Sequence, residues 1–350
     1  GSSLALVAAT PHAVYAMSGF AEPRLACCLC GALVGLAWFD SCDGSDPRGL
    51  WLAGISAAAA IGVKFAVGGL MAGALVLALI ASPARSLRAL LRLAVFPLAA
   101  GLLHLFWNLE RFGSVWDLGY PEAAEMGRRL NDFDTPAALG LFGLLLSPGK
   151  GLAFFAPPIL VSLAFFPLVR KRSPLAAIAS AAFFALCLVL YSKYSAWEGG
   201  YCFGPRYLLP AVPGLMLGLP FAMASSRRKA AIVACALGLL VQVPGLLTSF
   251  TEDQMAGGRY YDDTYRYRLD YTPAGQWGLA ARYAPGLLSG GAWNEPLGLG
   301  ADFWFVFLVR AGFHRNLIAG WLIVALCLSA AGVILLRRAV LVGGPAPPEH

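Results

Sequence analysis

The sequence predicts an all-α polytopic membrane protein with about ten transmembrane helices and with re-entrant or interfacial helices on its outer face. Hydrophobic residues make up 59% of the 350 residues and charged residues only 13%, and the mean hydropathy is +0.68. Soluble domains are nearer half apolar and a quarter charged, so this composition excludes a soluble or a disordered protein. The apolar residues also fall into runs long enough to cross a hydrocarbon core of about 30 Å, and short basic clusters separate these runs.

The expected spans follow from the lengths of the apolar runs, which are 4–20, 24–39, 50–65, 67–82, 93–109, 152–169, 174–191, 207–224, 230–249 and 317–336. A shorter run at 137–147 cannot cross a membrane and is expected to be re-entrant or interfacial. The run 50–82 is compatible with one long tilted helix or with a tight pair broken at Gly68-Gly69. We favour the pair, because it brings every unusual polar residue to one membrane face.

The basic clusters predict how the spans are oriented. They comprise Arg85, Arg88 and Arg92, then 170–172, 227–229 and 337–338. The positive-inside rule places all four in the cytoplasm. We therefore expect one transmembrane domain over 1–340, with 110–151 and 250–316 as extracytoplasmic loops, and a disordered tail over 341–350. This topology accounts for the net charge of +7, so nucleic acid is not an expected partner.

Two outer motifs place a cation beside glycines. Arg206 follows Gly199, Gly200 and Gly204 at the mouth of a span, where a guanidinium can hold a phosphate in a bidentate manner. The alternative is an interfacial arginine that extends to lipid headgroups. Lys150 lies in a glycine-rich turn that suits an anion, although the spacing of a nucleotide phosphate loop is absent. The alternative here is an ordinary turn.

Three other charges stand out against their apolar surroundings. Glu22 is an isolated carboxylate between two spans, and Lys64 lies within a mostly apolar stretch. A charge at membrane depth is costly, so both are candidate functional residues. Glu22 could equally be a solvated acid at the start of the next helix. Arg111 could face an anion or pair with its neighbour Glu110 at the membrane boundary. No histidine or cysteine spacing indicates a metal site, whereas Lys64, Arg111, Lys150 and Arg206 suit a phosphate or pyrophosphate.

The order of these motifs resembles bacterial members of the GT-C superfamily of membrane glycosyltransferases. The nearest likeness is to the protein-mannosyltransferase-like and aminoarabinose-transferase-like branch, and it extends over residues 10–215. The segments that carry it are Thr10-Pro11 to Tyr15, Phe20 to Pro23, Gly54 to Lys64, Asn108 to Gly113, Ser147 to Gly151 with Pro157-Pro158, and Trp197 to Pro210.

The resemblance implies a GT-C-like fold and an enzyme that moves a sugar from a polyprenyl-phosphate-linked donor to a lipid, glycan or protein acceptor on the extracytoplasmic face. It implies that Lys64, Arg111, Lys150 and Arg206 bind the carrier phosphate. In the family the catalytic acid lies in the first outer loop. The sequence is expected to begin beyond that loop and to lack the N-terminal spans, so the main base is expected before residue 1, with Glu22 as an auxiliary acid or base. The substrate cavity is expected to include Tyr15, Trp197, Glu198 and Tyr207.

Such a protein would be a multi-pass protein of the bacterial cytoplasmic membrane, with membrane lipids and the lipid-linked sugar as its partners. The sequence identifies no cofactor, and it leaves room for a divalent cation. Two other functions remain open: a polymerase or ligase of lipid-linked glycans, which shares the outer basic residues, and a transporter or flippase. A transporter would carry polar groups at the bilayer midplane and an internal repeat. Neither feature is evident in the sequence.

Overall fold

The computed structural model describes residues 2–15, 20–83, 86–116, 133–200, 202–247, 272–278 and 281. The chain divides into two compact units, 1–300 and 301–350, and the described residues all belong to the first. Several predictions therefore lie outside the described residues. They are the span 317–336, Arg85, the pair 337–338, the tail 341–350, residues 117–132 of the first long loop, and almost all of the loop 250–316.

The described residues form helices and contain no strand. Their α-helices are α1 (Ser2–Ala8), α2 (His12–Tyr15), α3 (Glu22–Ser41), α4 (Arg48–Val63), α5 (Phe65–Ile80), α6 (Leu87–Phe112), α7 (Ala137–Leu146), α8 (Leu152–Phe155), α9 (Pro158–Ala164), α10 (Phe166–Arg172), α11 (Pro174–Lys193), α12 (Val212–Leu215), α13 (Leu219–Met223) and α14 (Arg228–Leu247). There are also two 3₁₀ helices, η2 (Arg206–Ala211) and η3 (Met216–Gly218), and residues 273–278 are helical.

Five segments in this part of the chain are long and apolar enough to cross a membrane. They are α3, α6, α11, α14 and the compound helix Arg206–Met223 that runs from η2 to α13. The prediction of an all-helical fold is confirmed for the described residues, and these five segments make it compatible with a membrane protein. The helices α4, α5 and α7 are apolar but shorter.

The segment 50–82 forms two helices, as favoured from the sequence. The expected break point was wrong, because α4 ends at Val63 and α5 begins at Phe65, so the break is at Lys64. Lys64 has extended backbone angles, with φ −156° and ψ 102°, and its carbonyl accepts the N–H of Gly68. The glycine pair lies inside α5 instead. There Gly68 permits close contact, because a Cβ at this position would come within 2.2 Å of the Ile61 nitrogen.

Two expected spans are divided by prolines. The run 4–20 is not one helix, because α1 ends at Ala8 and α2 begins at His12, on either side of Pro11. Proline disfavours helical backbone in the residue before it, and here the Thr10 hydroxyl instead bonds the Leu6 carbonyl. The run 152–169 is divided into α8, α9 and α10 at Pro157 and near Pro167. The hydropathy pattern alone did not predict these breaks.

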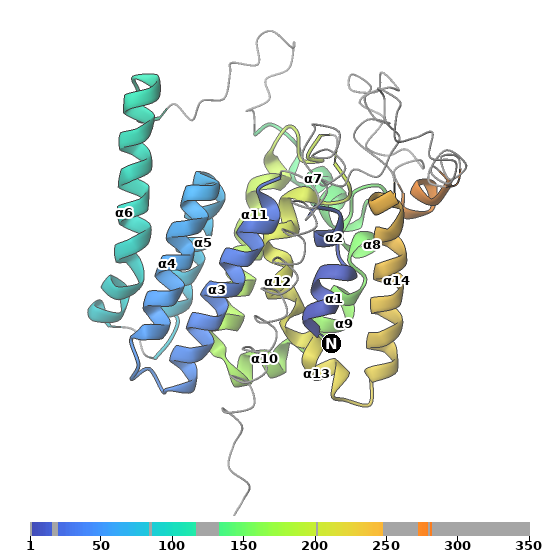
Figure 1. The fold of residues 1–350 in the computed structure, drawn as a ribbon, viewed down its shortest axis with the longest axis horizontal. Coiled ribbons are helices and arrows are strands. Elements are labelled where there is room, and N and C mark those ends of the chain that lie inside the picture. Colours follow the sequence, from blue (N-terminus) through green and yellow to red (C-terminus); the bar gives the residue numbers. More distant parts are fainter. Residues whose placement is uncertain are drawn as a thin grey trace, which may run out of the picture. The chain divides into compact units, whose positions relative to one another are not determined.

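Helices α3, α4, α5 and α6 alternate in direction, so their ends gather at two opposite ends of the bundle (Figure 1). At one end α3 begins at Glu22, α6 ends at Phe112 and α11 ends at Lys193. At the other, which we call the basic end, α4 begins at Arg48, α10 ends at Arg172 and α14 begins at Arg228. This distribution agrees with the alternation predicted from the basic clusters.

Small residues set the spacing between α3 and α4. A Cβ on Gly35 would lie 2.4 Å from the Gly49 carbonyl oxygen, and a Cβ on Gly49 would lie 2.5 Å from that of Gly35. Both positions therefore bring the two backbones into direct contact, as small residues do between membrane helices. This contact packs α3, whose first residue is Glu22, closely against α4.

Candidate functional site

A buried carboxylate is at the centre of the candidate site. Glu22 is the first residue of α3, followed by Pro23, and its side chain is 1% exposed. An acidic residue in the first turn is stabilised by the partial positive charge at a helix N-terminus. Its Oε1 atom lies 3.0 Å from Nε of Arg206 and 3.5 Å from Nζ of Lys64. One oxygen thus joins two cations from distant parts of the chain.

Lys64 reaches this carboxylate because the helical backbone is interrupted beneath it. It is the residue between α4 and α5, at the tip of the hairpin they form. The hairpin turns at the end of the bundle where Glu22 lies, so a charge expected to be costly in an apolar stretch meets a partner. Its side chain is 22% exposed, so it is only partly buried.

Arg206 is positioned by a glycine-rich loop at the start of η2. Gly199 and Gly204 have φ values of +83° and +65°, which residues other than glycine rarely adopt. The Nη1 atom of Arg206 lies 3.5 Å from the Gly199 carbonyl oxygen, while Nε faces Glu22. The side chain is 23% exposed. The loop directs the guanidinium to the carboxylate.

Aromatic rings surround the two cations. The Lys64 ammonium lies 5.3 Å from the centre of the Tyr207 ring, and the Arg206 guanidinium lies 5.7 Å from the same ring. Tyr207 stacks on Tyr191 with a centroid distance of 4.3 Å and an angle of 2°. Phe20 lies under Arg206, 4.1 Å from the guanidinium carbon, where the ring's negative face attracts a cation. No specific role was assigned to Phe20 or to Tyr191 from the sequence. We call Glu22, Lys64, Arg206 and Tyr207 the ion cluster.

Lys150 occupies a different position from the other two cations. Its side chain is 1% exposed, and the ammonium donates to the carbonyls of Gly200 and Cys202 at 3.3 and 2.5 Å. The Cys202 sulfur is also 3.2 Å away. An ammonium has three donors, and three acceptors of one loop surround it. In this structure Lys150 therefore fastens the turn 147–151 to the loop that carries Arg206, and its ammonium is not open to a phosphate.

Arg111 lies in the last turn of α6, and its side chain is exposed. Its guanidinium carbon is 5.2 Å from the Phe112 ring and 6.0 Å from the Trp107 ring. Within the described part of the chain no ion pair joins Arg111 to Glu22. The structure thus does not place it in the ion cluster, although it lies at the same end of the bundle.

The four predicted cavity residues differ in their surroundings. Tyr207 belongs to the ion cluster, whereas Tyr15, Trp197 and Glu198 are almost completely buried. The Tyr15 hydroxyl donates to the Phe203 carbonyl at 3.1 Å, which links the segment before α3 to the Arg206 loop. Trp197 packs on α7, where a Cβ on Gly143 would lie 2.2 Å from its ring. In this structure these three side chains belong to the packed interior and not to an open cavity.

The ion cluster carries one more positive than negative charge. Two cations share a single carboxylate oxygen, and Oε2 of Glu22 is buried without a hydrogen-bond partner among the described residues. Partly exposed cations beside a carboxylate can accept one further anionic group, which a phosphate monoester or diester would supply. Among the residues that the structure describes, no three histidine, cysteine or acidic side chains gather as metal ligands would.

Comparisons with protein-family profiles, with curated proteins and with solved structures find no match to this chain. The function is therefore inferred from the site itself. Its decisive feature is that Glu22, Lys64 and Arg206 come from α3, from the α4–α5 break and from the start of η2, and meet at one atom.

Proposed function

We propose that the protein is an integral-membrane glycosyltransferase of the GT-C type. It moves a sugar from a polyprenyl-phosphate-linked donor to a lipid, glycan or protein acceptor on the extracytoplasmic face of the bacterial cytoplasmic membrane. The observation that carries the proposal is the pair of partly exposed cations, Lys64 and Arg206, on the buried carboxylate of Glu22.

The position of the cluster supports a lipid-linked substrate. It lies at an end of a bundle that contains five helices long and apolar enough to cross a membrane. It is opposite the basic end, where Arg170, Lys171 and Arg172 close α10. The positive-inside rule places such clusters in the cytoplasm, so the ion cluster faces outward in the proposal. A polyprenyl phosphate presents its phosphate at this boundary while its chain stays in the lipid.

The cations act on the leaving group. In the proposed reaction a hydroxyl oxygen of the acceptor attacks the anomeric carbon, and the bond between that carbon and the phosphate oxygen breaks. The departing lipid phosphate takes the bonding electron pair, and Lys64 and Arg206 stabilise its charge. The proton of the hydroxyl passes to a carboxylate. Tyr207, beside both cations, flanks the phosphate or the sugar.

Glu22 has an auxiliary part in this proposal. Because Oε1 is shared by two cations, the carboxylate fixes where their charges lie and keeps them from repelling each other. This is a positioning role, and it leaves the proton-accepting step chiefly to another group. Lys150 likewise acts through the loop that it fastens, since its ammonium contacts carbonyls of that loop.

The test is transfer of radiolabelled sugar from polyprenyl-phosphate donors to membrane acceptors by the full-length protein in liposomes, with any residues before residue 1 included. Arg206→Ala and Lys64→Met are expected to lower transfer about a hundredfold or more, as loss of transition-state charge stabilisation does. Lys193→Met, a lysine change at the same end of the bundle, serves as the control and is expected to retain activity. Transfer unchanged in both cluster variants would refute the proposal. Movement of the lipid across the bilayer without transfer would favour a flippase, and extension of a glycan chain would favour a polymerase.

A further inference from the structure

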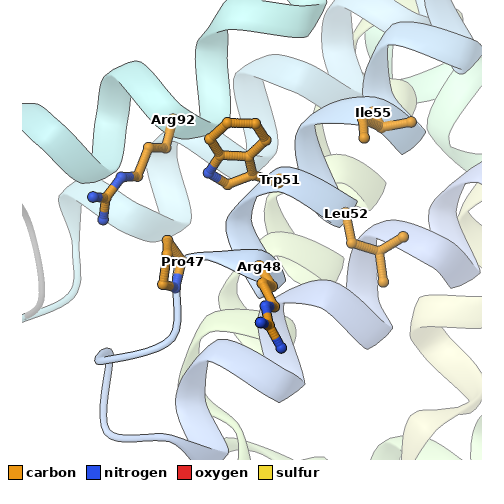
Figure 2. A pocket seen from close by; sticks show the side chains of 6 residues that line it. All are labelled: Pro47, Arg48, Trp51, Leu52, Ile55 and Arg92. Atoms are coloured by element: carbon orange, nitrogen blue, oxygen red, sulfur yellow. The ribbon is translucent and has the colours of Figure 1, made fainter.

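A second candidate site lies at the basic end, away from the ion cluster. A pocket of about 500 Å³ opens between the start of α4 and the second turn of α6. Its lining consists of Pro47, Arg48, Trp51, Leu52, Ile55 and Arg92. Figure 2 shows the two arginines on either side of Pro47, with Leu52 and Ile55 farther along α4. Nothing in the proposed transfer reaction uses these residues.

The pocket is built by the way α4 and α6 cross. A Cβ on Gly54 would lie 2.5 Å from the Leu93 carbonyl oxygen, so the two backbones touch there. Trp51 is held edge-on to Phe96 of α6, at a centroid distance of 5.9 Å. Arg48, Leu52 and Ile55 follow at a spacing that places them on one face of α4. The groove therefore lies where α4 and α6 are in direct contact.

The lining combines two cations with an apolar surface. Arg48 and Arg92 are exposed, and the ion pairs found among the described residues involve neither of them. The nearby Asp46 carboxylate accepts the backbone N–H of Arg48 at 2.9 Å. Trp51 and Ile55 are 46% and 49% exposed, although both are large and apolar. The pocket thus offers positive charge at its mouth and an uncovered hydrocarbon surface beside it.

We propose that this pocket binds one anionic phospholipid of the cytoplasmic leaflet. The two guanidiniums hold the phosphate, to which arginine bonds in a bidentate manner, and Trp51, Leu52 and Ile55 contact the first part of an acyl chain. Ile55 is seven residues beyond Arg48, which is about 10 Å along a helix and matches the depth from a headgroup to its upper methylenes.

Charge and position favour this occupant over others. The pocket lies at the end that also carries Arg170, Lys171 and Arg172, and anionic lipids give the cytoplasmic leaflet a negative surface. A zwitterionic lipid supplies no net charge for two guanidiniums. An apolar peptide seated in the groove would bury both cations without a counter-charge, which is costly.

Native mass spectrometry of the detergent-purified full chain tests the proposal, with added phosphatidylglycerol or phosphatidylcholine. We expect one phosphatidylglycerol to be retained, and its affinity to fall about tenfold or more in Arg48→Gln/Arg92→Gln, because hydrogen bonds to charged groups are lost. Arg170→Gln/Arg172→Gln removes two exposed arginines at the same end and is the matched control, with affinity expected to stay unchanged.

A second variant covers the case in which the double change prevents folding. Ile55→Trp keeps both arginines and fills the apolar part of the groove at an exposed position, so it is expected to weaken retention as well. Equal retention of the two lipids would overturn the proposal. So would an equal loss of affinity in Arg48→Gln/Arg92→Gln and in the control Arg170→Gln/Arg172→Gln. A dimer that Arg48→Gln/Arg92→Gln dissociates would also overturn it and assign the groove to a second copy. None of these outcomes depends on sugar transfer.

Discussion

The Nε atom of Arg206 lies 3.0 Å from Oε1 of Glu22, although the two residues are 184 positions apart. The contact joins the start of α3 to the start of η2, and Lys64 approaches the same oxygen from the α4–α5 break. A buried carboxylate with two cationic partners is energetically coupled to both of them. The ion cluster is therefore expected to respond to substitution as a unit.

A double-mutant cycle on Glu22 and Arg206 measures this coupling. Glu22→Gln leaves two cations without their counter-charge, and Arg206→Gln leaves the carboxylate with Lys64 alone. Each single change is expected to lower the free energy of unfolding by about 1–3 kcal/mol, and the double change by about 1–2 kcal/mol less than the sum. Unfolding by SDS titration in mixed micelles provides the measurement. Additive effects would show that the two residues are not energetically coupled in the micelle-solubilised protein.

Replacing Lys150 is expected to release the loop that carries Arg206. Lys150→Met keeps the length of the side chain but leaves the carbonyls of Gly200 and Cys202 without their donor. We expect a loss of about 1–3 kcal/mol of stability and faster maleimide labelling of the buried Cys202 thiol, followed by mass spectrometry. Cys187, buried in α11, is the internal reference that should stay unlabelled. Labelling of Cys202 at the wild-type rate would contradict the fastening role.

The sequence predicted the parts of this fold that hydropathy controls. α3, α6, α11 and α14 coincide with long apolar runs, and their alternation agrees with the basic clusters. The runs 4–20 and 152–169 were not correctly predicted, because a hydropathy pattern weighs apolar side chains and ignores the missing N–H and fixed φ of proline. Pro11 and Pro157 were the signals that could have identified those breaks.

The candidate site could be predicted only in part, because the sequence shows which residues are charged and does not show the backbone path around them. Glu22, Lys64 and Arg206 are conspicuous charges in an apolar chain, and topology brought them to one end. The partner of Lys150 could not be inferred, because it depends on where the carbonyls of Gly200 and Cys202 point. That direction is set by the backbone path through a loop with positive φ at its glycines. Sequence identifies the charge, but not its acceptor.

Two adjacent glycines in α5 provide a matched test of the close contact between α4 and α5, the two helices that flank Lys64. A Cβ on Gly68 would lie 2.2 Å from the Ile61 nitrogen of α4, whereas a Cβ on Gly69 would meet no atom within 4 Å. Gly68→Ala is expected to force the α4–α5 hairpin apart and to cost about 1–3 kcal/mol. Gly69→Ala should be neutral or stabilise the helix by up to about 1 kcal/mol. Thermal unfolding midpoints in detergent compare the two, and equal midpoints would disprove the close contact.

Asp40 is expected to stabilise the basic end by capping a helix from another part of the chain. Its Oδ2 atom accepts the Ser173 hydroxyl at 2.6 Å and the Leu175 N–H at 3.0 Å, both at the start of α11. The negative charge also faces the positive end of the α11 dipole. Asp40→Ala is therefore expected to lower the free energy of unfolding by about 1–2 kcal/mol, and Asp40→Asn, which retains an acceptor, by less.

Asp43 provides the control for charge at the same end of the bundle. It is exposed and has a φ of +48°, a conformation that asparagine tolerates, so Asp43→Asn removes a carboxylate without strain. SDS titration of the three variants should rank Asp40→Ala as the least stable and Asp43→Asn as equal to the wild type. If Asp43→Asn and Asp40→Ala lost the same stability, the effect would come from net charge at this end. The link between the end of α3 and the start of α11 would then be energetically unimportant.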